Sequence, residues 1–155
     1  MMKYIILHNI RSRHNVGAIF RTADGAGVSK IFLTGYTPAP IDRFGREVIE
    51  IKKTSLGASA MVAWERADFA LSIIRSLQKN DFSIVAVEQA SDSISLYDFS
   101  EPEKTVYVFG NEITGIESEV LEICDSIIEI PMLGQKESLN VAVTAGIVLF
   151  HHQVI

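Results

Sequence analysis

The hydrophobic residues of this chain fall into short apolar runs, separated by segments in which they recur at helical spacing. Consecutive apolar residues rich in β-branched and aromatic side chains are typical of strands buried on both faces of a sheet. Recurrence three and four positions apart is typical of helices with one buried side. Six strands are predicted, at 3–9, 30–34, 61–65, 83–88, 106–109 and 126–130.

Two long helices are predicted in the first half of the chain. We expect Asn15 to cap a helix that runs to about Ala26, because its side chain can accept a hydrogen bond from the first turn. Arg21 lies off the apolar stripe of this helix and is free to face the end of the sheet. A second helix is expected from a cap at Asp68 to about Lys79.

Shorter helices are predicted within 47–58 and at 116–123, and Asn140 is expected to cap an apolar helix over 141–152. Strands that alternate with helices indicate an α/β fold with a mainly parallel sheet flanked by helices. We found no internal repeat and no linker. One domain over residues 1–155 is therefore predicted, long enough for a substantial core.

Composition fits an ordinary globular protein, with 48% hydrophobic and 21% charged residues. No apolar stretch approaches the roughly 20 residues that span a bilayer, and the first apolar run is too short for a signal peptide. The lone cysteine, Cys124, excludes an internal disulfide and favours a reducing cytoplasm. No basic residue lies close to it in the sequence, so a small buried side chain is expected there.

The charge is unevenly distributed. Residues 1–53 hold nine Lys or Arg against four Asp or Glu, a net charge of +5, whereas the rest of the chain carries −10. A basic region on an acidic body can bind a polyanion locally, although a solvated face is an equally good explanation of charge alone.

Familiar nucleotide and metal motifs are excluded. Residues 110–116 have P-loop glycine spacing, but Ile116 stands where the lysine is required. The GAGVSK segment follows a helix and precedes a strand, which is the reverse of the order in a dinucleotide site. The four histidines have no metal-ligand spacing, so no metal is expected, and His151 and His152 favour a solvated or interface role.

Polar loops follow two of the buried strands. Residues 110–115 follow the strand at 106–109, and residues 133–140 follow the strand at 126–130. In a parallel sheet, ligands bind at the ends of such strands. A third loop, 35–48, is rich in Pro and Gly and long for a compact domain, which makes it a candidate substrate loop.

Three segments occur in an order that is hard to attribute to chance, although each alone is explained by turns and caps. They are NVGAIFRTADGAGV at 15–28, FGNEITGI at 109–116 and IPMLGQKESLNVAV at 130–143. Together they resemble the SPOUT superfamily of RNA methyltransferases, in its SpoU (TrmH-like) branch, over the whole chain. The resemblance implies a C-terminal deep trefoil knot, S-adenosylmethionine as cofactor, and a homodimer with a site shared between subunits.

The resemblance also implies roles for individual residues. The cofactor-binding residues are expected to be Glu88, Gly110, Asn111, Glu112, Ile130, Pro131, Met132, Ser138, Leu139 and Asn140. Arg21 is expected to be catalytic, with Asn15, Glu112, Ser138 and Asn140 as partners in the site. One departure is Ala142, where many relatives carry serine; Ser138 and Asn140 remain.

The chemistry implied is transfer of the sulfonium methyl group to a ribose 2′-hydroxyl. Arg21 is expected to clamp a phosphate and stabilise the developing oxyanion, because a guanidinium stays protonated and cannot act as base. Glu112 is expected to orient Arg21 or a neighbour. Transfer RNA is the preferred substrate, by analogy with relatives whose RNA-binding domains this sequence lacks. The alternatives are ribosomal RNA and a catalytically silent RNA-binding module of the same fold.

Overall fold

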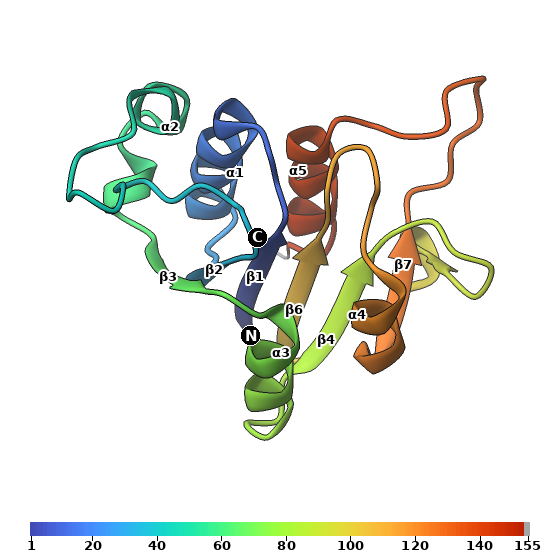
Figure 1. The fold of residues 1–155 in the computed structure, drawn as a ribbon. Helices are drawn as coiled ribbons and strands as arrows, with labels where there is room; N and C mark the ends of the chain where they lie inside the picture. The colour runs from blue at the N-terminus through green and yellow to red at the C-terminus, as the bar shows by residue number, and fades with distance from the viewer. Residues whose placement is uncertain (154–155) are drawn as a thin grey trace.

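Seven parallel strands form the centre of the molecule (Figure 1). The computed structural model describes residues 1–153. Across the sheet the strands are β3 (Ala63–Ala67), β2 (Lys30–Thr34), β1 (Met2–His8), β6 (Lys104–Phe109), β4 (Ser83–Val87), β7 (Ser126–Glu129) and β5 (Ile94–Ser95). All pairings between these strands are parallel, which confirms the predicted α/β fold with a mainly parallel sheet.

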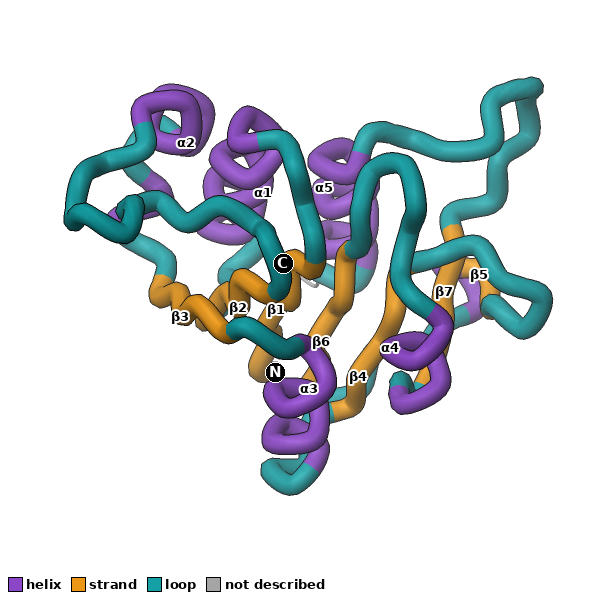
Figure 2. The backbone as a smooth tube through the Cα atoms, in the orientation of Figure 1, coloured by secondary structure: helices purple, strands orange, loops and turns teal. Residues whose placement is uncertain are grey.

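Helices cover both faces of the sheet (Figure 2). One face carries α1 (Arg13–Gly25), α2 (Ile49–Ser55) and α5 (Val141–His151). The other face carries α3 (Ala70–Gln78) and α4 (Ser118–Ile123). Single 3-10 turns lie at Ala58–Ala60 and Leu96–Asp98.

The central strands are buried on both faces because consecutive apolar residues point to opposite sides. In β1, Ile5 and Leu7 pack with α1 and α5, whereas Ile6 packs with α3 and α4. In β6, Tyr107 packs on the face of α1 and α5, whereas Val108 packs on the face of α3 and α4. Both side chains are fully buried. The continuous apolar runs are thus explained by the two helical layers.

The first helix begins earlier than predicted. Its N-cap is Ser12, not Asn15, and the Ser12 hydroxyl accepts a hydrogen bond from the Asn15 backbone N–H at 3.1 Å. Both residue types cap helices well, and sequence alone did not decide between them. As a consequence, the Asn15 side chain is available for contacts outside the helix.

The segment around β3 also differs from prediction. The strand covers Ala63–Ala67 and not 61–65, because its register is set by pairing with β2, where Lys30 lies opposite Ala63. The following helix starts after Phe69, which makes no side-chain cap, so the expected cap at Asp68 is wrong. The other predicted helices and strands lie within three residues of their predicted ends, whereas the two-residue strand β5 was not predicted.

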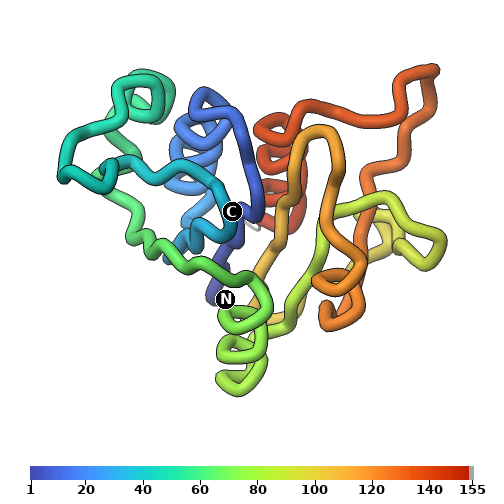
Figure 3. Tube along the Cα trace, viewed as in Figure 1, coloured from blue at the N-terminus to red at the C-terminus, as the bar shows by residue number. Residues whose placement is uncertain are grey.

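The last part of the chain crosses back over the molecule. Residues 130–140 lead from β7 to α5, which lies beside α1 (Figure 3). The Lys3 ammonium donates a hydrogen bond to the Leu149 carbonyl at 3.2 Å and so joins the two ends of the described chain. Within residues 1–153, no helix combines the length and apolar character needed to cross a membrane.

Candidate functional site: a pocket at the carboxyl ends of three strands

A pocket of about 410 Å³ lies where β4, β6 and β7 end, with the loop before α5 on its far side. This volume falls in the range of small-molecule sites. Its lining residues are Val87, Glu88, Gln89, Phe109, Gly110, Asn111, Glu112, Ile113, Thr114, Gly115, Ile116, Leu121, Glu129, Ile130, Met132, Ser138, Leu139, Val141 and Thr144.

Most of the residues expected at a cofactor site meet in this pocket. Those that line it are Glu88, Gly110, Asn111, Glu112, Ile130, Met132, Ser138 and Leu139. Pro131 and Asn140 are not among the lining residues. Segments separated by up to fifty positions in the sequence thus form one concave surface.

Gly110 leaves no room for a side chain. A Cβ atom there would lie 2.8 Å from the Gly115 carbonyl oxygen, so the backbone of the 110–117 loop would have to move. Gly115 itself has φ of +71°, a left-handed conformation that favours glycine. At these two glycines the wall of the pocket is therefore backbone, held by a tight turn in which the Asn111 and Gly115 backbones bond to each other.

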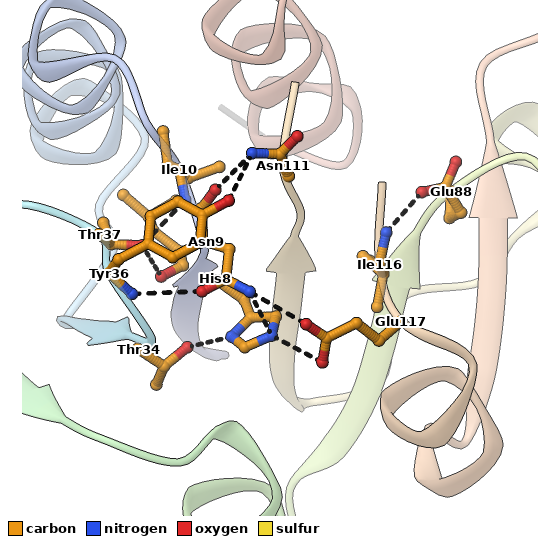
Figure 4. Close-up of polar contacts among 11 residues, drawn as sticks. His8, Asn9, Ile10, Thr34, Tyr36, Thr37, Glu88, Asn111, Ile116 and Glu117 are labelled. Carbon is orange, nitrogen blue, oxygen red and sulfur yellow. Dashed lines mark hydrogen bonds and ion pairs between the residues drawn. The ribbon is translucent and has the colours of Figure 1, made fainter. Parts of the chain in front are cut away.

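Glu88 fixes this turn from the neighbouring strand. One of its carboxylate oxygens accepts a hydrogen bond from the Ile116 backbone N–H at 3.0 Å, and the other accepts from the Gln89 N–H at 2.9 Å. The loops that follow β4 and β6 are joined by this side chain (Figure 4).

The pocket is acidic. Three carboxylates, those of Glu88, Glu112 and Glu129, are among its lining residues, and no Lys, Arg or His of the described chain lines it. Carboxylates attract a cationic ligand and repel a polyphosphate. The charge of the pocket agrees with the exclusion of P-loop and dinucleotide motifs from the sequence.

Glu112 connects the pocket to the start of α1. Its carboxylate accepts hydrogen bonds from the backbone N–H groups of Arg11 at 3.1 Å and Ser12 at 3.2 Å, and from Asn15 Nδ2 at 3.4 Å. Partial burial raises the pKa of the Glu112 carboxyl, but backbone N–H donors outweigh burial, and the net pKa is lowered. A carboxylate that receives such donors stays ionised.

Asn140 and Asn15 meet beside Glu112. Asn140 caps α5 as predicted, with Oδ1 accepting from the backbone N–H groups of Ala142 at 2.8 Å and Val143 at 3.4 Å. Its Nδ2 donates to Asn15 Oδ1 at 3.2 Å. Three of the expected site residues, Asn15, Glu112 and Asn140, thus form one chain of hydrogen bonds at the edge of the pocket.

Arg21 lies away from this cluster. It is exposed, six residues beyond Asn15, which is roughly 9 Å along a helix. It is not among the hydrogen-bond donors to Glu112, whose side-chain partner is Asn15. Arg21 lines a separate groove between α1, α2 and the end of α5, with His14, Ala18, Thr22, Lys53, Thr54, Leu56 and Phe150.

A polar network at the ends of β1, β2 and β6 was missed by sequence reasoning (Figure 4). Asn111 Nδ2 donates to the Asn9 carbonyl at 3.0 Å and to the Tyr36 hydroxyl at 2.9 Å. Asn9, with φ of +55°, also accepts from the Tyr36 N–H through Oδ1 at 3.2 Å. The loop that carries Asn111 is therefore held from two neighbouring strands.

His8 continues this network below the surface. Its Nδ1 lies 2.9 Å from the Thr34 hydroxyl and its Nε2 lies 3.3 Å from a carboxylate oxygen of Glu117. The only signal in the sequence was a polar residue directly after an apolar run, and that pattern also fits an ordinary strand end. His8 and Thr34 are buried, so they support the loops and do not face the pocket.

Two further findings concern metal binding and the lone cysteine. Within residues 1–153, no group of three or more His, Cys, Asp or Glu side chains is arranged to hold a metal ion. Cys124, at the end of α4, is half-buried, and burial raises the pKa of its thiol to about 12. A thiol with so high a pKa stays protonated and unreactive at neutral pH, as expected for a small packing side chain.

Fold and site together define an α/β protein with an acidic pocket at the carboxyl edge of a parallel sheet. The match of residues 2–150 to the SpoU rRNA Methylase family identifies it further. The chain belongs to this family, and the resemblance drawn from the three sequence segments is confirmed.

Two similar proteins are themselves described as RNA methyltransferases. The chain is 32% identical over 149 residues to the tRNA (guanosine(18)-2′-O)-methyltransferase of Aquifex aeolicus, and the match covers 96% of this chain and 67% of that protein. It resembles the AdoMet-bound rRNA methyltransferase from Sinorhizobium meliloti with a TM-score of 0.87 and 28% identity, covering 99% of this chain and 57% of that one.

A third relative has nearly the same length. It is a solved structure described as "Structural insights into the 2-OH methylation of C/U34 on tRNA". The match has a TM-score of 0.82 and 25% identity, and it covers 97% of this chain and 93% of that one. The other two relatives are longer, and this chain spans about two thirds of one and little more than half of the other.

Proposed function

We propose that this protein is an S-adenosylmethionine-dependent RNA methyltransferase that modifies the ribose 2′-hydroxyl. The observation that carries the proposal is the acidic, glycine-walled pocket at the ends of β4, β6 and β7. S-adenosylmethionine carries a sulfonium and an ammonium, and its net positive charge suits three carboxylates with no cation beside them. Its bulk suits a pocket of about 410 Å³.

The residues that would hold the cofactor are those of the pocket wall. The bare backbone at Gly110 allows a flat ring to approach closely, and Ile130, Met132 and Leu139 offer apolar contact. Glu88 would act by fixing the loop, since its carboxylate is occupied by the Ile116 and Gln89 N–H groups. When bound, the cofactor supplies an electrophilic methyl group, so the protein need only position the acceptor and help to remove its proton.

We assign Arg21 to the acceptor side of the reaction. Its guanidinium would clamp an RNA phosphate and stabilise the developing 2′-oxyanion, while phosphate or water takes the proton, because arginine does not give up its own. Asn15, Glu112, Ser138 and Asn140 would orient the groups around it. In one chain Arg21 and the pocket belong to different surfaces, so a mechanism that uses both would need a second chain.

A homodimer would supply that second chain. Val143 and Phe150 on α5 are 51% and 46% exposed, and half-buried Ile147 lies between them at helical spacing. Together they form an apolar stripe that a partner could cover. The stripe runs between the end of the pocket loop and the groove of Arg21, so a second copy packed on it would lie close to both.

We further infer that residues 1–155 form one catalytic unit and that the chain from β7 to α5 makes a deep trefoil knot. The inference is supported by the return of residues 130–140 across the loops that follow β4 and β6. Gln89 Nε2 donates to the Glu137 carbonyl at 2.5 Å and ties the returning segment to one of those loops. Threading of this kind would fix the pocket wall without any covalent link.

Transfer RNA is the favoured substrate class, and ribosomal RNA is the alternative. Support comes from the relative of matching length, whose structure concerns methylation of tRNA. We place the enzyme in the cytoplasm because the half-buried Cys124 thiol suits a reducing compartment that also contains these RNAs.

Incubation with RNA and radiolabelled S-adenosylmethionine, followed by nucleoside analysis, tests the proposal. Label is expected on ribose in the tRNA fraction. Label confined to ribosomal RNA would move the substrate to the alternative class, and label on a base would overturn the 2′-O assignment. Binding of cofactor and RNA without any transfer would identify a silent RNA-binding module.

A further inference from the structure

The loop between β2 and α2 contains a small turn, residues 42–46, that is held by its own hydrogen bonds. Asp42 accepts from the backbone N–H groups of Phe44 at 2.8 Å and Arg46 at 2.9 Å, and its second oxygen accepts from Arg46 Nε at 3.1 Å. Gly45 has φ of +76°, which allows the chain to reverse. A bridge between Ile41 and Glu47 closes the turn.

This turn holds two guanidinium groups against one aromatic ring. The Arg43 guanidinium carbon lies 4.7 Å from the Phe44 ring centroid, and that of Arg46 lies 4.9 Å from it. Phe44 is nevertheless 66% exposed. A single exposed phenylalanine is ordinary, but an exposed ring that pre-orders two arginines on a fixed turn is an arrangement suited to a ligand.

The charges identify the class of ligand. Arg46 is paired with Asp42 at 3.1 Å, and the pKa of the Asp42 carboxyl is lowered, chiefly by the Arg46 backbone N–H, so this pair is neutral overall. Arg43 forms no ion pair with any carboxylate of the described chain. One unpaired, pre-ordered guanidinium beside an exposed ring suits a phosphate joined to an unpaired base.

The base of the loop is rigid and lies at the same edge of the sheet as the cofactor pocket. Buried Thr37 accepts from the Ile10 N–H at 3.0 Å and donates to the Leu7 carbonyl at 2.8 Å. The Tyr36 hydroxyl is bonded to Asn111, which lines the pocket. From there the loop extends outward past β3, drawn in cyan in Figure 1. RNA bound at the pocket edge could continue along it.

We propose that Arg43 and Phe44 form an RNA contact outside the cofactor pocket, in which Arg43 binds a backbone phosphate and Phe44 orders it and stacks on an unpaired base. The inference rests on the proposed function only for the identity of the partner as RNA. Because neither residue lines the cofactor pocket, the contact sets RNA affinity and leaves the methyl-transfer step unchanged.

Three variants measured against bulk tRNA by fluorescence anisotropy test this contact. Arg43→Ala is expected to raise the Kd roughly tenfold, the usual result of losing one charge-assisted contact. It should also flatten the plot of log Kd against log salt by about 0.7 to 0.9, equivalent to one phosphate. Phe44→Ala is expected to raise the Kd about fivefold or more without changing that slope, since it removes a stacking contact but no charge. Arg43→Lys should lie between wild type and Arg43→Ala.

Matched controls come from α3, on the opposite side of the sheet. Arg75→Ala removes one exposed arginine and Phe69→Ala removes a ring that is 74% exposed, and both should leave the Kd unchanged. Wild-type affinity in Arg43→Ala and Phe44→Ala would overturn the proposal. An equal loss of RNA affinity in Arg75→Ala would mean that Arg43 acts only through the net charge of the protein. That outcome would also contradict the proposal.

The outcome is independent of the methyltransferase assignment. Affinity losses in a protein that transfers no methyl group would support the RNA contact and refute the proposed activity. Methyl transfer with unchanged affinity in Arg43→Ala and Phe44→Ala would support the proposed activity and refute the RNA contact. Single-turnover rates at saturating tRNA should match wild type in all three variants, and a lowered rate there would contradict a role limited to binding.

Discussion

The cofactor pocket and the groove of Arg21 differ in the sign of their charge. The pocket is lined by three glutamates and no cation, whereas the groove is lined by His14, Arg21 and Lys53 and no carboxylate of the described chain. An acidic site suits a sulfonium cofactor and a basic site suits RNA phosphate. Each surface is unsuited to the ligand of the other.

This separation explains why one chain is not expected to suffice. Keeping Arg21 away from the pocket prevents it from repelling the cofactor or pairing with Glu112. The proposed mechanism uses both groups at one ribose, so under it a second copy would bring its Arg21 to the first copy's pocket. Substitutions at Arg21, Gly110 and Val143 test that division of labour.

Removal of Arg21 should abolish catalysis without emptying the pocket. We expect Arg21→Ala to lower turnover roughly a hundred- to a thousandfold, the usual result of losing a preorganised charge donor. The residue is exposed on α1, so stability should change by about 0.5 kcal/mol or less. Arg21→Lys should stay poor if a planar fork is needed. Single-turnover kinetics at saturating cofactor, with calorimetry of cofactor binding, measure both effects.

Mixing two inactive variants tests whether the site is shared. A dimer of one Arg21→Ala chain and one Gly110→Ala chain has one site with an intact pocket and an intact partner arginine. Random pairing should then restore about a quarter of wild-type activity. If Arg21 served the pocket of its own chain, every site would keep a defect and mixing would restore nothing.

Filling the pocket wall should have the opposite effect to removing Arg21. A Cβ at Gly110 would lie 2.8 Å from the Gly115 backbone and displace the loop, so Gly110→Ala should weaken cofactor binding about a hundredfold. Gly134→Ala is the matched control, because a Cβ added there would meet nothing within 4 Å and the φ of Gly134 is not positive. Equal affinity in both variants, measured by calorimetry, would remove Gly110 from the site.

A substitution in the apolar stripe on α5 tests whether this stripe forms the proposed dimer interface. Val143→Asp should raise the dimer dissociation constant by tenfold or more, because a carboxylate would be buried in the interface. The helix itself should survive, since acidic residues are favourable in a first turn. Sedimentation over a dilution series measures the change, and the same substitution at exposed Ile113 is the control. An unchanged dimer would mean that α5 does not form the interface.

The smallest effect concerns the Glu112 carboxylate that joins the pocket to α1. Its pKa is lowered in the folded protein, so it contributes stability above about pH 4.5, its ordinary value, and loses it as pH falls below that. Glu112→Gln should lower the free energy of unfolding at pH 7 by about 1 kcal/mol, and solvent screening will reduce this. The difference from wild type should shrink toward pH 3.

Glu103→Gln, at an exposed carboxylate with no side-chain hydrogen bond in the described chain, should show no such pH dependence. Denaturant unfolding between pH 3 and 7 makes the comparison. A constant difference between Glu112→Gln and wild type over this range would mean that the Glu112 charge is not involved.

The amino-acid sequence was enough to predict the layers of this molecule and the family to which it belongs. Apolar runs such as those of β1 and β6 require burial on both faces of the sheet. A sheet between two helical layers provides this burial. Gly110 and the Asn140 cap were readable because each depends on a few neighbouring residues. The three segments that resemble known methyltransferases were found in order, and their family was confirmed.

The contacts between polar side chains, in contrast, could be read only from the folded chain. Ser12 took the cap that Asn15 was expected to make, which freed Asn15 to join Glu112 and Asn140, about a hundred residues away in the sequence. The bond from Asn111 to Tyr36 and the distance of Arg21 from the pocket follow from the strand order, which periodicity does not contain. A pattern of apolar residues fixes what is buried, whereas the partners of a polar side chain depend on which distant segments the fold brings beside it.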